Sequence, residues 1–297
     1  MPAKTSNVLG IVLVIGAYFL FAVQDALIKL LVTDVSVPQI LFVRSVVILL
    51  FCMLVDRRCV ERSIHSAVKM AMLGRGLVLF GAWLFYYSSA RSLQLAEMMT
   101  IYFASPLIVV LLAVPLLGEK VSTSRWAAIA VGFAGVVLAC RPTELDQPVP
   151  ILMALAAAVL WAYGIILIRS LANAESTFMQ MFLTSSVFLV GCGLSLPWLW
   201  VTPSGMEALL LLLVGLLAAG AQFMLYEGMK HAPASVAAPL EFTALIWAFG
   251  LGFLIWGDVP VLAVFAGAAL IMLSELMVIT SEIRRTRSGK TAVGRAI

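Results

Sequence analysis

Charge is scarce in this sequence of 297 residues. Aspartate, glutamate, lysine and arginine together make up 11% of it, whereas hydrophobic residues make up 63% and the mean hydropathy is +1.10. Soluble domains are about one quarter charged, so this composition excludes a soluble globular protein and indicates an integral membrane protein. The net charge of +4 comes from loops and the C-terminal tail, so it calls for no nucleic-acid partner.

Residues that carry catalytic or metal chemistry are scarce as well. The two histidines, His65 and His231, fall between apolar runs, and the chain has no H-E-x-x-H and no G-x-x-x-x-G-K-[ST] motif. Its four cysteines are widely spaced, which favours packing over a disulfide or a metal site. A membrane-embedded enzyme needs a nucleophile, base or metal cluster at bilayer depth. We therefore predict no enzyme, no metal and no cofactor.

Long apolar runs are abundant. Ten of them, each about 20 residues long and able to cross a bilayer as a helix, are separated by short polar or Pro/Gly-marked turns. They span 8–31, 37–55, 70–90, 95–117, 122–140, 150–169, 178–198, 206–229, 234–256 and 260–280. Stretches such as LLLLLVGLLAAG lack the period-two alternation of barrel strands, and the first run is too long for a signal peptide. The sequence predicts an all-α integral membrane protein with ten transmembrane helices.

Lysine and arginine are unevenly distributed between the loops. Most lie in loops on the side of the N-terminus or in the tail SEIRRTRSGKTAVGRAI, whereas the loops of the other side hold Arg91 and Arg141. Loops rich in positive charge stay in the cytoplasm. We therefore expect both termini to be cytoplasmic, in a protein of the bacterial inner (plasma) membrane.

The chain also contains an internal repeat. A shift of about 140 residues lays LFAVQDALIKLL on LWAYGIILIRSL, and similar shifts pair Tyr87 with Tyr226 and Phe103 with Phe242. We predict two five-helix repeats, 1–140 and 141–280, followed by a basic cytoplasmic tail, 281–297. Because five is odd, the second copy must be inverted, as in many secondary transporters with a site near the midplane.

The last helix of each repeat carries a matched A-x-x-x-G, at Ala128 and Gly132 in one copy and at Ala263 and Gly267 in the other. Small residues at this spacing allow two helices to approach closely, which predicts that the two halves clasp there. The alternative is that these small residues only fill space within a bundle.

Ten helices in two five-helix copies resemble the drug/metabolite transporter superfamily, in particular its EamA-type branch. The turn LLGEKVS at 116–122, its partner IWGDVPV at 255–261 and the segment APASVAAPLEF at 232–242 carry the likeness, which covers essentially the whole chain. The resemblance implies a carrier of small metabolites such as amino acids, often moved outward, without an ATP-binding domain.

Asp25 and Arg44 are the ionisable residues within the runs that lack a simple explanation. They lie at equal sequence distances from the turn between the first two runs, so an antiparallel hairpin would place them at one depth. Their repeat equivalents are Ile165 and Thr184, so acid and base are absent together in the second copy. This joint absence predicts an ion pair, with Lys29 as a competing partner for Asp25. Three roles stay open: a static staple, an outer gate, or a proton-coupling carboxylate at Asp25.

Glu241 and Tyr102 occupy equivalent positions in the two copies, and each lies near a proline, Pro239 or Pro106. Proline cannot donate the hydrogen bond that continues a helix, and polar residues beside matching helix breaks are typical of transporter binding sites. The alternative for Glu241 is a hydrogen bond to a neighbouring helix or to water.

Aromatic and amide side chains lie deep in several of the runs. Together with Glu241, the candidates for substrate binding are Gln24, Tyr87, Tyr102, Trp161, Tyr163, Gln222 and Tyr226. Such a lining suits an uncharged or zwitterionic metabolite of amino-acid size. The leading hypothesis is a secondary transporter, a monomer or weak homodimer in the lipid bilayer, that exports amino acids or related compounds. The alternatives are import of a flavin-like vitamin and, outside transport, a membrane-embedded enzyme or a structural bundle.

Overall fold

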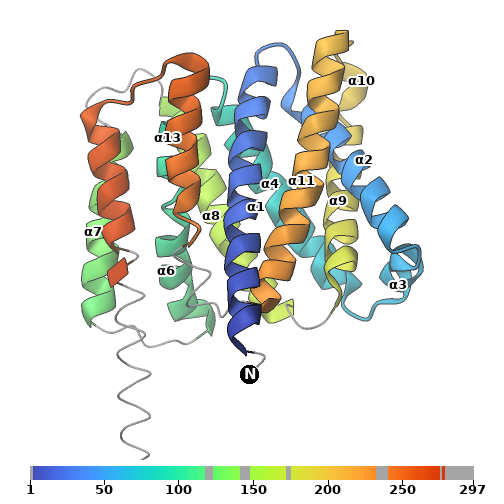
Figure 1. Ribbon diagram of the computed structural model, residues 1–297, viewed down its shortest axis with the longest axis horizontal. Coiled ribbons are helices and arrows are strands. Elements are labelled where there is room, and N and C mark those ends of the chain that lie inside the picture. The colour runs from blue at the N-terminus through green and yellow to red at the C-terminus, as the bar shows by residue number, and fades with distance from the viewer. Residues whose placement is uncertain are drawn as a thin grey trace, which may run out of the picture.

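A computed structural model of the chain describes residues 3–117, 123–140, 148–171, 175–231, 240–274, 276 and 277, and all its regular structure is helical (Figure 1). The helices are α1 (Ala3–Leu31), α2 (Val37–Val55), α3 (Cys59–His65), α4 (Lys69–Ser89), α5 (Leu95–Tyr102), α6 (Ser105–Leu117), α7 (Thr123–Cys140), α8 (Pro148–Leu171), α9 (Thr177–Gly193), α10 (Leu196–Leu199), α11 (Gly205–His231), α13 (Thr243–Trp256) and a terminal helix, Leu262–Ser274. Parts of the motifs at 116–122 and 232–242, together with the tail 281–297, lie outside the described residues.

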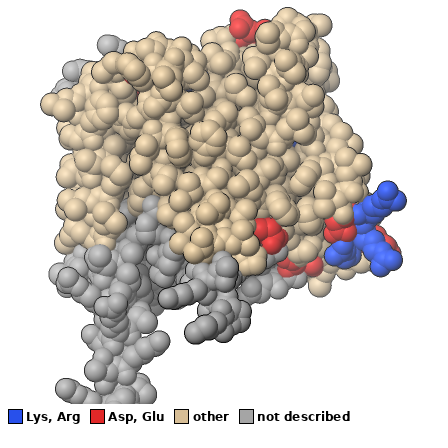
Figure 2. Space-filling view, in the orientation of Figure 1, with Lys and Arg blue, Asp and Glu red and all other residues tan. Residues whose placement is uncertain are grey.

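The predicted spans are confirmed as helices. Within the described residues, four helices are long and apolar enough to cross a membrane, namely Val8–Leu31, Val37–Val55, Lys69–Ser89 and Gly205–Gly228, and six shorter apolar helices occupy the other predicted runs. Large apolar side chains face outward, such as Leu54 (79% exposed) and Leu262 (82% exposed). Figure 2 shows charged side chains near the ends of the bundle with an uncharged band between them. An apolar outer surface of this kind suits contact with lipid.

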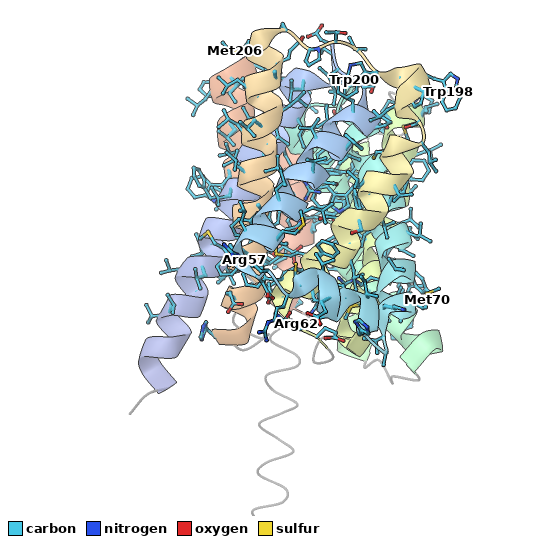
Figure 3. All side chains as sticks on the ribbon, turned by 90° about the vertical axis from the view of Figure 1, so that its right-hand side faces the viewer. Arg57, Arg62, Met70, Trp198, Trp200 and Met206 are labelled. Carbon is cyan, nitrogen blue, oxygen red and sulfur yellow. The ribbon has the colours of Figure 1, made fainter. Side chains whose placement is uncertain are left out.

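Side chains at the two ends of the bundle differ in kind. Trp198 and Trp200, in and after α10, lie at one end, whereas Arg57 and Arg62 lie toward the opposite end, in and beside α3 (Figure 3). Tryptophan and arginine at the two edges of an apolar band are typical membrane-interface residues. The arrangement fits helices that run across the membrane in alternating directions.

Equivalent helices of the two repeats have equivalent neighbours. The first helix of one repeat packs against the third helix of the other, as α1 does on α11 and α8 does on α4. The second helices, α2 and α9, pack on each other, and so do α5 and α13 of the fourth spans. The equivalent rings Phe103 and Phe242 lie 5.6 Å apart. Contacts between equivalent elements are what a pseudo-twofold axis between two inverted copies produces.

The last helices of the two repeats approach each other at glycine. A Cβ atom added to Gly135 of α7 would lie 2.7 Å from the Gly267 carbonyl oxygen, and one added to Gly267 would lie 2.6 Å from that of Gly135. The Ser274 hydroxyl donates a hydrogen bond to the Ala128 carbonyl at 2.7 Å. The predicted close approach is therefore confirmed, with Gly135 rather than Gly132 as the backbone partner of Gly267.

The first two helices do not form the simple hairpin that the sequence suggests. α1 packs mainly on α11 and α13, whereas α2 packs mainly on α9 and α11. Helix α11 of the second repeat therefore contacts both of them and lies between them in Figure 1. Equal depth along α1 and α2 consequently does not bring two side chains into contact.

Candidate functional site

The fourth span of each repeat is interrupted at the same place. In the first repeat α5 ends at Tyr102 and α6 begins at Ser105, directly before Pro106, and in the second a turn at Glu241 and Phe242 precedes α13. Pro106 lacks the N–H that would bond to the Tyr102 carbonyl, which explains the first break. The predicted break at Tyr102 is confirmed, and the second repeat has a turn at the equivalent position, Glu241, whereas residues 232–239 before it lie outside the described residues.

Five aromatic side chains form a closed ring beside these breaks, which we call the aromatic ring. Its members are Trp83, Tyr86 and Tyr87 of α4, Tyr102 of α5 and Trp161 of α8. Successive centroids around the ring are 5.3, 5.2, 4.8, 6.1 and 6.4 Å apart. Such spacing is typical of stabilising aromatic pairs. The ring combines four residues of the first repeat with one of the second.

Helix α4 supplies three members of the aromatic ring because of their spacing. Trp83, Tyr86 and Tyr87 are separated by three and four residues, so they share one face of the helix. The substrate-binding candidates from the sequence do not include Trp83, and they also miss Tyr86. Its position next to Tyr87 and three residues after Trp83 was the available signal.

Asp25 lies against the aromatic ring. Its two carboxylate oxygens accept hydrogen bonds from the hydroxyls of Tyr87 at 2.9 Å and Tyr86 at 3.1 Å. The neighbouring Gln24 amide donates to the Tyr87 hydroxyl at 2.6 Å. Asp25 is 5% exposed and Gln24 is fully buried. The acid singled out in the sequence is therefore held by neutral donors on α4.

Arg44 does not form the predicted ion pair with Asp25. Among the described residues, contacts within 4.0 Å between acidic and basic groups join Lys29 to Asp258 and Arg62 to Asp56. The Arg44 guanidinium instead lies over the Trp83 ring, 4.5 Å from its centroid. The physical reason is the packing of α2 on α9 and α11, which leaves α4 to supply the partners of Asp25.

The start of α2 fixes the position of Arg44. The Ser36 hydroxyl caps the helix by accepting a hydrogen bond from the Gln39 amide, and a proline lies in the first turn. The Gln39 side chain exchanges two hydrogen bonds with the backbone of Val201, at 2.8 and 2.9 Å. These contacts hold the N-terminal end of α2 to the segment after α10, within about two turns of Arg44.

Lys29, the predicted competitor for Asp25, points elsewhere. Its ammonium group donates to the Leu93 carbonyl at 2.7 Å, lies 3.9 Å from Asp258 and sits 5.2 Å from the centroid of Trp256. These partners belong to the turn after α4 and to the end of α13 and the turn that follows it. Lys29 therefore ties α1 to two neighbouring segments at the end of the bundle where α1 finishes.

The remaining candidates divide into those near the aromatic ring and those away from it. Glu241 is partly exposed and lies within electrostatic range of Tyr18 and Tyr102. Tyr226 is within electrostatic range of Arg44 but packs in a separate apolar cluster. Tyr163 is 39% exposed, because it lies two residues after Trp161 and therefore on the opposite face of α8. Gln222 is partly buried on α11, and no hydrogen bond joins it to the ring among the described residues.

Comparison with known proteins places these features in a family. The sequence matches the EamA-like transporter family twice, over residues 8–141 and 149–280. A solved crystal structure with 20% sequence identity superposes on 95% of this chain and 98% of its own with a TM-score of 0.63, which shows the shared fold.

Three curated relatives are transporters by name. The chain is 30% identical to a riboflavin transporter of Rhizobium johnstonii over 64% of either chain, just under two thirds of each. It is 26% identical to an S-adenosylmethionine uptake transporter of Rickettsia prowazekii over 91% of either chain. It is also 26% identical to a pseudopaline exporter of Pseudomonas aeruginosa, over 89% of this chain and 94% of the relative.

Proposed function

Because this chain belongs to the EamA-like transporter family and is an integral membrane transporter of small molecules, we propose that it binds its substrate at the aromatic ring and carries it across the membrane by alternating access. The observation that carries this proposal is the composition of the ring, to which α4 and α5 of the first repeat and α8 of the second contribute. When two inverted halves rock against each other, a site built from both is reshaped.

The helix breaks at Tyr102 and Glu241 support the same location for the site. Irregular backbone at membrane depth is tolerated only where protein buries it or where it lines a cavity. In both repeats a polar side chain lies next to the break, and these two side chains, Tyr102 and Glu241, are within electrostatic range of each other. The breaks also provide points about which the spans can bend.

For the substrate we propose an amino acid or a related metabolite that moves outward. The side chains of the aromatic ring hold an apolar or planar group, while Gln24, Asp25 and Arg44 supply polar contacts for charged groups. We further propose that both termini are cytoplasmic. All parts of the proposed site lie within one chain, which favours a monomer or a weak homodimer as the working unit.

A flavin is the second candidate substrate. A fused planar ring would stack on one of the large side chains Trp83 and Trp161 and contact the other with its edge, since their planes lie at 75° with centroids 6.4 Å apart. The similarity to a riboflavin transporter favours the same substrate class. Uptake rather than export would be the natural direction for a vitamin.

Purified protein in liposomes tests these proposals directly. We would measure the uptake of labelled amino acids, nucleosides and riboflavin, with vesicles of the wild type and of two variants. Trp161→Ala removes a member of the aromatic ring, whereas Tyr163→Ala changes the exposed face of the same helix. Saturable flux that is lost in Trp161→Ala and kept in Tyr163→Ala supports the proposal. Saturable flux that Trp161→Ala leaves unchanged contradicts the location of the site.

For Asp25 we propose a proton-coupling role, in preference to a staple or gate formed with Arg44. Its carboxylate is bonded to two neutral hydroxyls and has no cation within 4.0 Å among the described residues, so no buried ion pair would be broken when it exchanges a proton. An imposed pH gradient should accelerate flux in the wild type and have no effect in Asp25→Asn.

The charge swap Asp25→Arg with Arg44→Asp separates this proposal from the gate. If the two residues act only on each other, the double variant should recover the flux that each single change removes. We expect no recovery, because the exchanged side chains would face different helices. Recovery would favour a direct pairing of the two residues, as a staple or a gate.

A further inference from the structure

Arg44 is buried with part of its hydrogen-bonding capacity unused. The residue is 2% exposed, and its Nε and Nη2 atoms have no hydrogen-bond partner among the described residues. The Trp83 ring covers one face of the guanidinium and supplies no acceptor. Burying a charge whose N–H groups are unpaired costs free energy, so a ligand that pairs these groups would bind favourably.

Arg75 shows what a structural arginine looks like in the same bundle. It is fully buried in α4, and its two terminal nitrogens donate to the side chains of Gln180 at 3.0 Å and Thr184 at 3.1 Å on α9. Its Nε atom alone is unpaired. Arg75 therefore joins two helices, whereas Arg44 keeps a neighbouring pair of donors, Nε and Nη2, that can bind both oxygens of one carboxylate.

Gln24 offers the complementary group. Because the Tyr87 hydroxyl donates its proton to Asp25, it must accept from Gln24, and this fixes the Gln24 amide with its nitrogen toward Tyr87. The opposite atom, Oε1, is buried and has no hydrogen-bond partner among the described residues. Arg44 lies over Trp83, the Trp83 centroid is 5.3 Å from that of Tyr87, and Tyr87 is bonded to Gln24, so the free donors and the free acceptor belong to one cluster.

We propose that Arg44 binds the carboxylate group of the transported molecule through Nε and Nη2, with Gln24 Oε1 accepting from a donor group of the same molecule. The proposal deepens the proposed function and rests on it, since it names the substrate class of that site. A phosphate would place about two negative charges next to Asp25. One guanidinium balances a single carboxylate better than it balances a phosphate.

Matched acids and amides test the proposal on the wild-type protein. The probes are benzoate with benzamide and L-tryptophan with L-tryptophanamide, each pair similar in shape and different in charge. Binding to purified protein in detergent is measured by the shift in Tm across a concentration series. Loss of a charge-assisted bidentate contact corresponds to about 10-fold weaker binding or more, so at least one acid should bind that much more tightly than its amide. If neither acid is preferred, the proposal is overturned.

Three variants locate the effect. Arg44→Gln should abolish the preference for the acid, and Arg44→Lys should retain part of it because the charge stays while the planar fork is lost. Arg75→Gln is the matched control: it lowers the Tm of the free protein but should keep the preference. A preference that survives in Arg44→Gln, or that disappears in Arg75→Gln from protein that is still folded, overturns the assignment to Arg44.

The outcome is separable from that of the transport proposal. Saturable flux without any difference between acid and amide would leave the transporter intact and refute carboxylate binding at Arg44. A clear preference for the acid in binding, together with no flux of any compound in the panel, would support the carboxylate site and refute transport of those compounds.

Discussion

In the first repeat, Gln24, Asp25 and Arg44 lie around the aromatic ring, whereas the second repeat has Gly164, Ile165 and Thr184 at the equivalent positions. The two copies nevertheless use equivalent helices for equivalent packing, since α1 lies on α11 as α8 lies on α4. The helix packing that both repeats share, which we call the frame, and the polar site therefore depend on different residues. The frame depends on features that both copies share, and the site depends on features that only one copy has.

The equivalent tyrosines illustrate the difference. Tyr87 is fully buried and bonded to both Asp25 and Gln24. Tyr226, its counterpart in the second repeat, packs at the edge of an apolar cluster built around Ile48, Cys52 and Met181. One residue type at one repeat position is thus part of a polar hydrogen-bond network in one copy and of apolar packing in the other.

The largest expected effect comes from damaging the shared frame. Gly135→Ala would place a methyl group 2.7 Å from the Gly267 backbone oxygen, which cannot move as a side chain can. We expect a loss of about 1–3 kcal/mol in stability, seen as a lower Tm in detergent and a smaller folded yield. Gly74→Ala is the control, because a Cβ there meets nothing within 4 Å. Equal Tm values for both variants would show that the close approach of Gly135 and Gly267 does not stabilise the frame.

A smaller effect, confined to function, should separate the two tyrosines. Tyr87→Phe removes a donor to Asp25 and the acceptor of Gln24, and hydrogen bonds to a charged group contribute about 1.5–3 kcal/mol. We expect kcat/KM for transport to fall by about tenfold or more in Tyr87→Phe, as that energy range implies, and to stay within about twofold in Tyr226→Phe. Equal losses in both variants would mean that the site is as symmetric as the frame.

The smallest effect should come from the tie at Lys29. The side chains of Lys29 and Asp258 are 13% and 22% exposed and their charged groups lie 3.9 Å apart, so we expect the pair to contribute at most about 1 kcal/mol. Loosening it with Lys29→Gln should favour opening at that end of the bundle. The measurement uses a background in which the other three cysteines are replaced, so that buried Cys192 alone can react. Its rate of reaction with an external maleimide should then rise by up to about fivefold.

Two further variants test the assignment to this tie. Asp258→Asn should reproduce the faster labelling, because it removes the other charge. Lys69→Gln, which changes a partly exposed lysine at the first residue of α4, should leave the rate as it is. A rate that Lys29→Gln does not change would show that this end of the bundle is held closed by packing alone. The repeat equivalents Arg169 and Glu119 have side chains outside the described residues.

Local patterns could be predicted because they act through neighbours in the chain. The apolar runs, the break at Pro106 and the equivalence of Phe103 with Phe242 needed only sequence spacing. The partner of Asp25 needed more, since it depends on which side chains of distant helices reach α1. Tyr86 and Tyr87 come from a helix that begins 44 residues later, at Lys69.

The sequence by itself determined the membrane class, the helical spans and the two copies, because hydropathy and proline chemistry are properties of short segments. Only the tertiary structure decided that α11 lies against both α1 and α2, so that Asp25 is bonded to Tyr86 and Tyr87 and Arg44 rests on Trp83. The physical reason is that helices in a bilayer gain nothing from hiding apolar surface from lipid. Their neighbours are set by the fit of small side chains such as Gly135 and Gly267 across the two repeats, which appears only when both copies are packed.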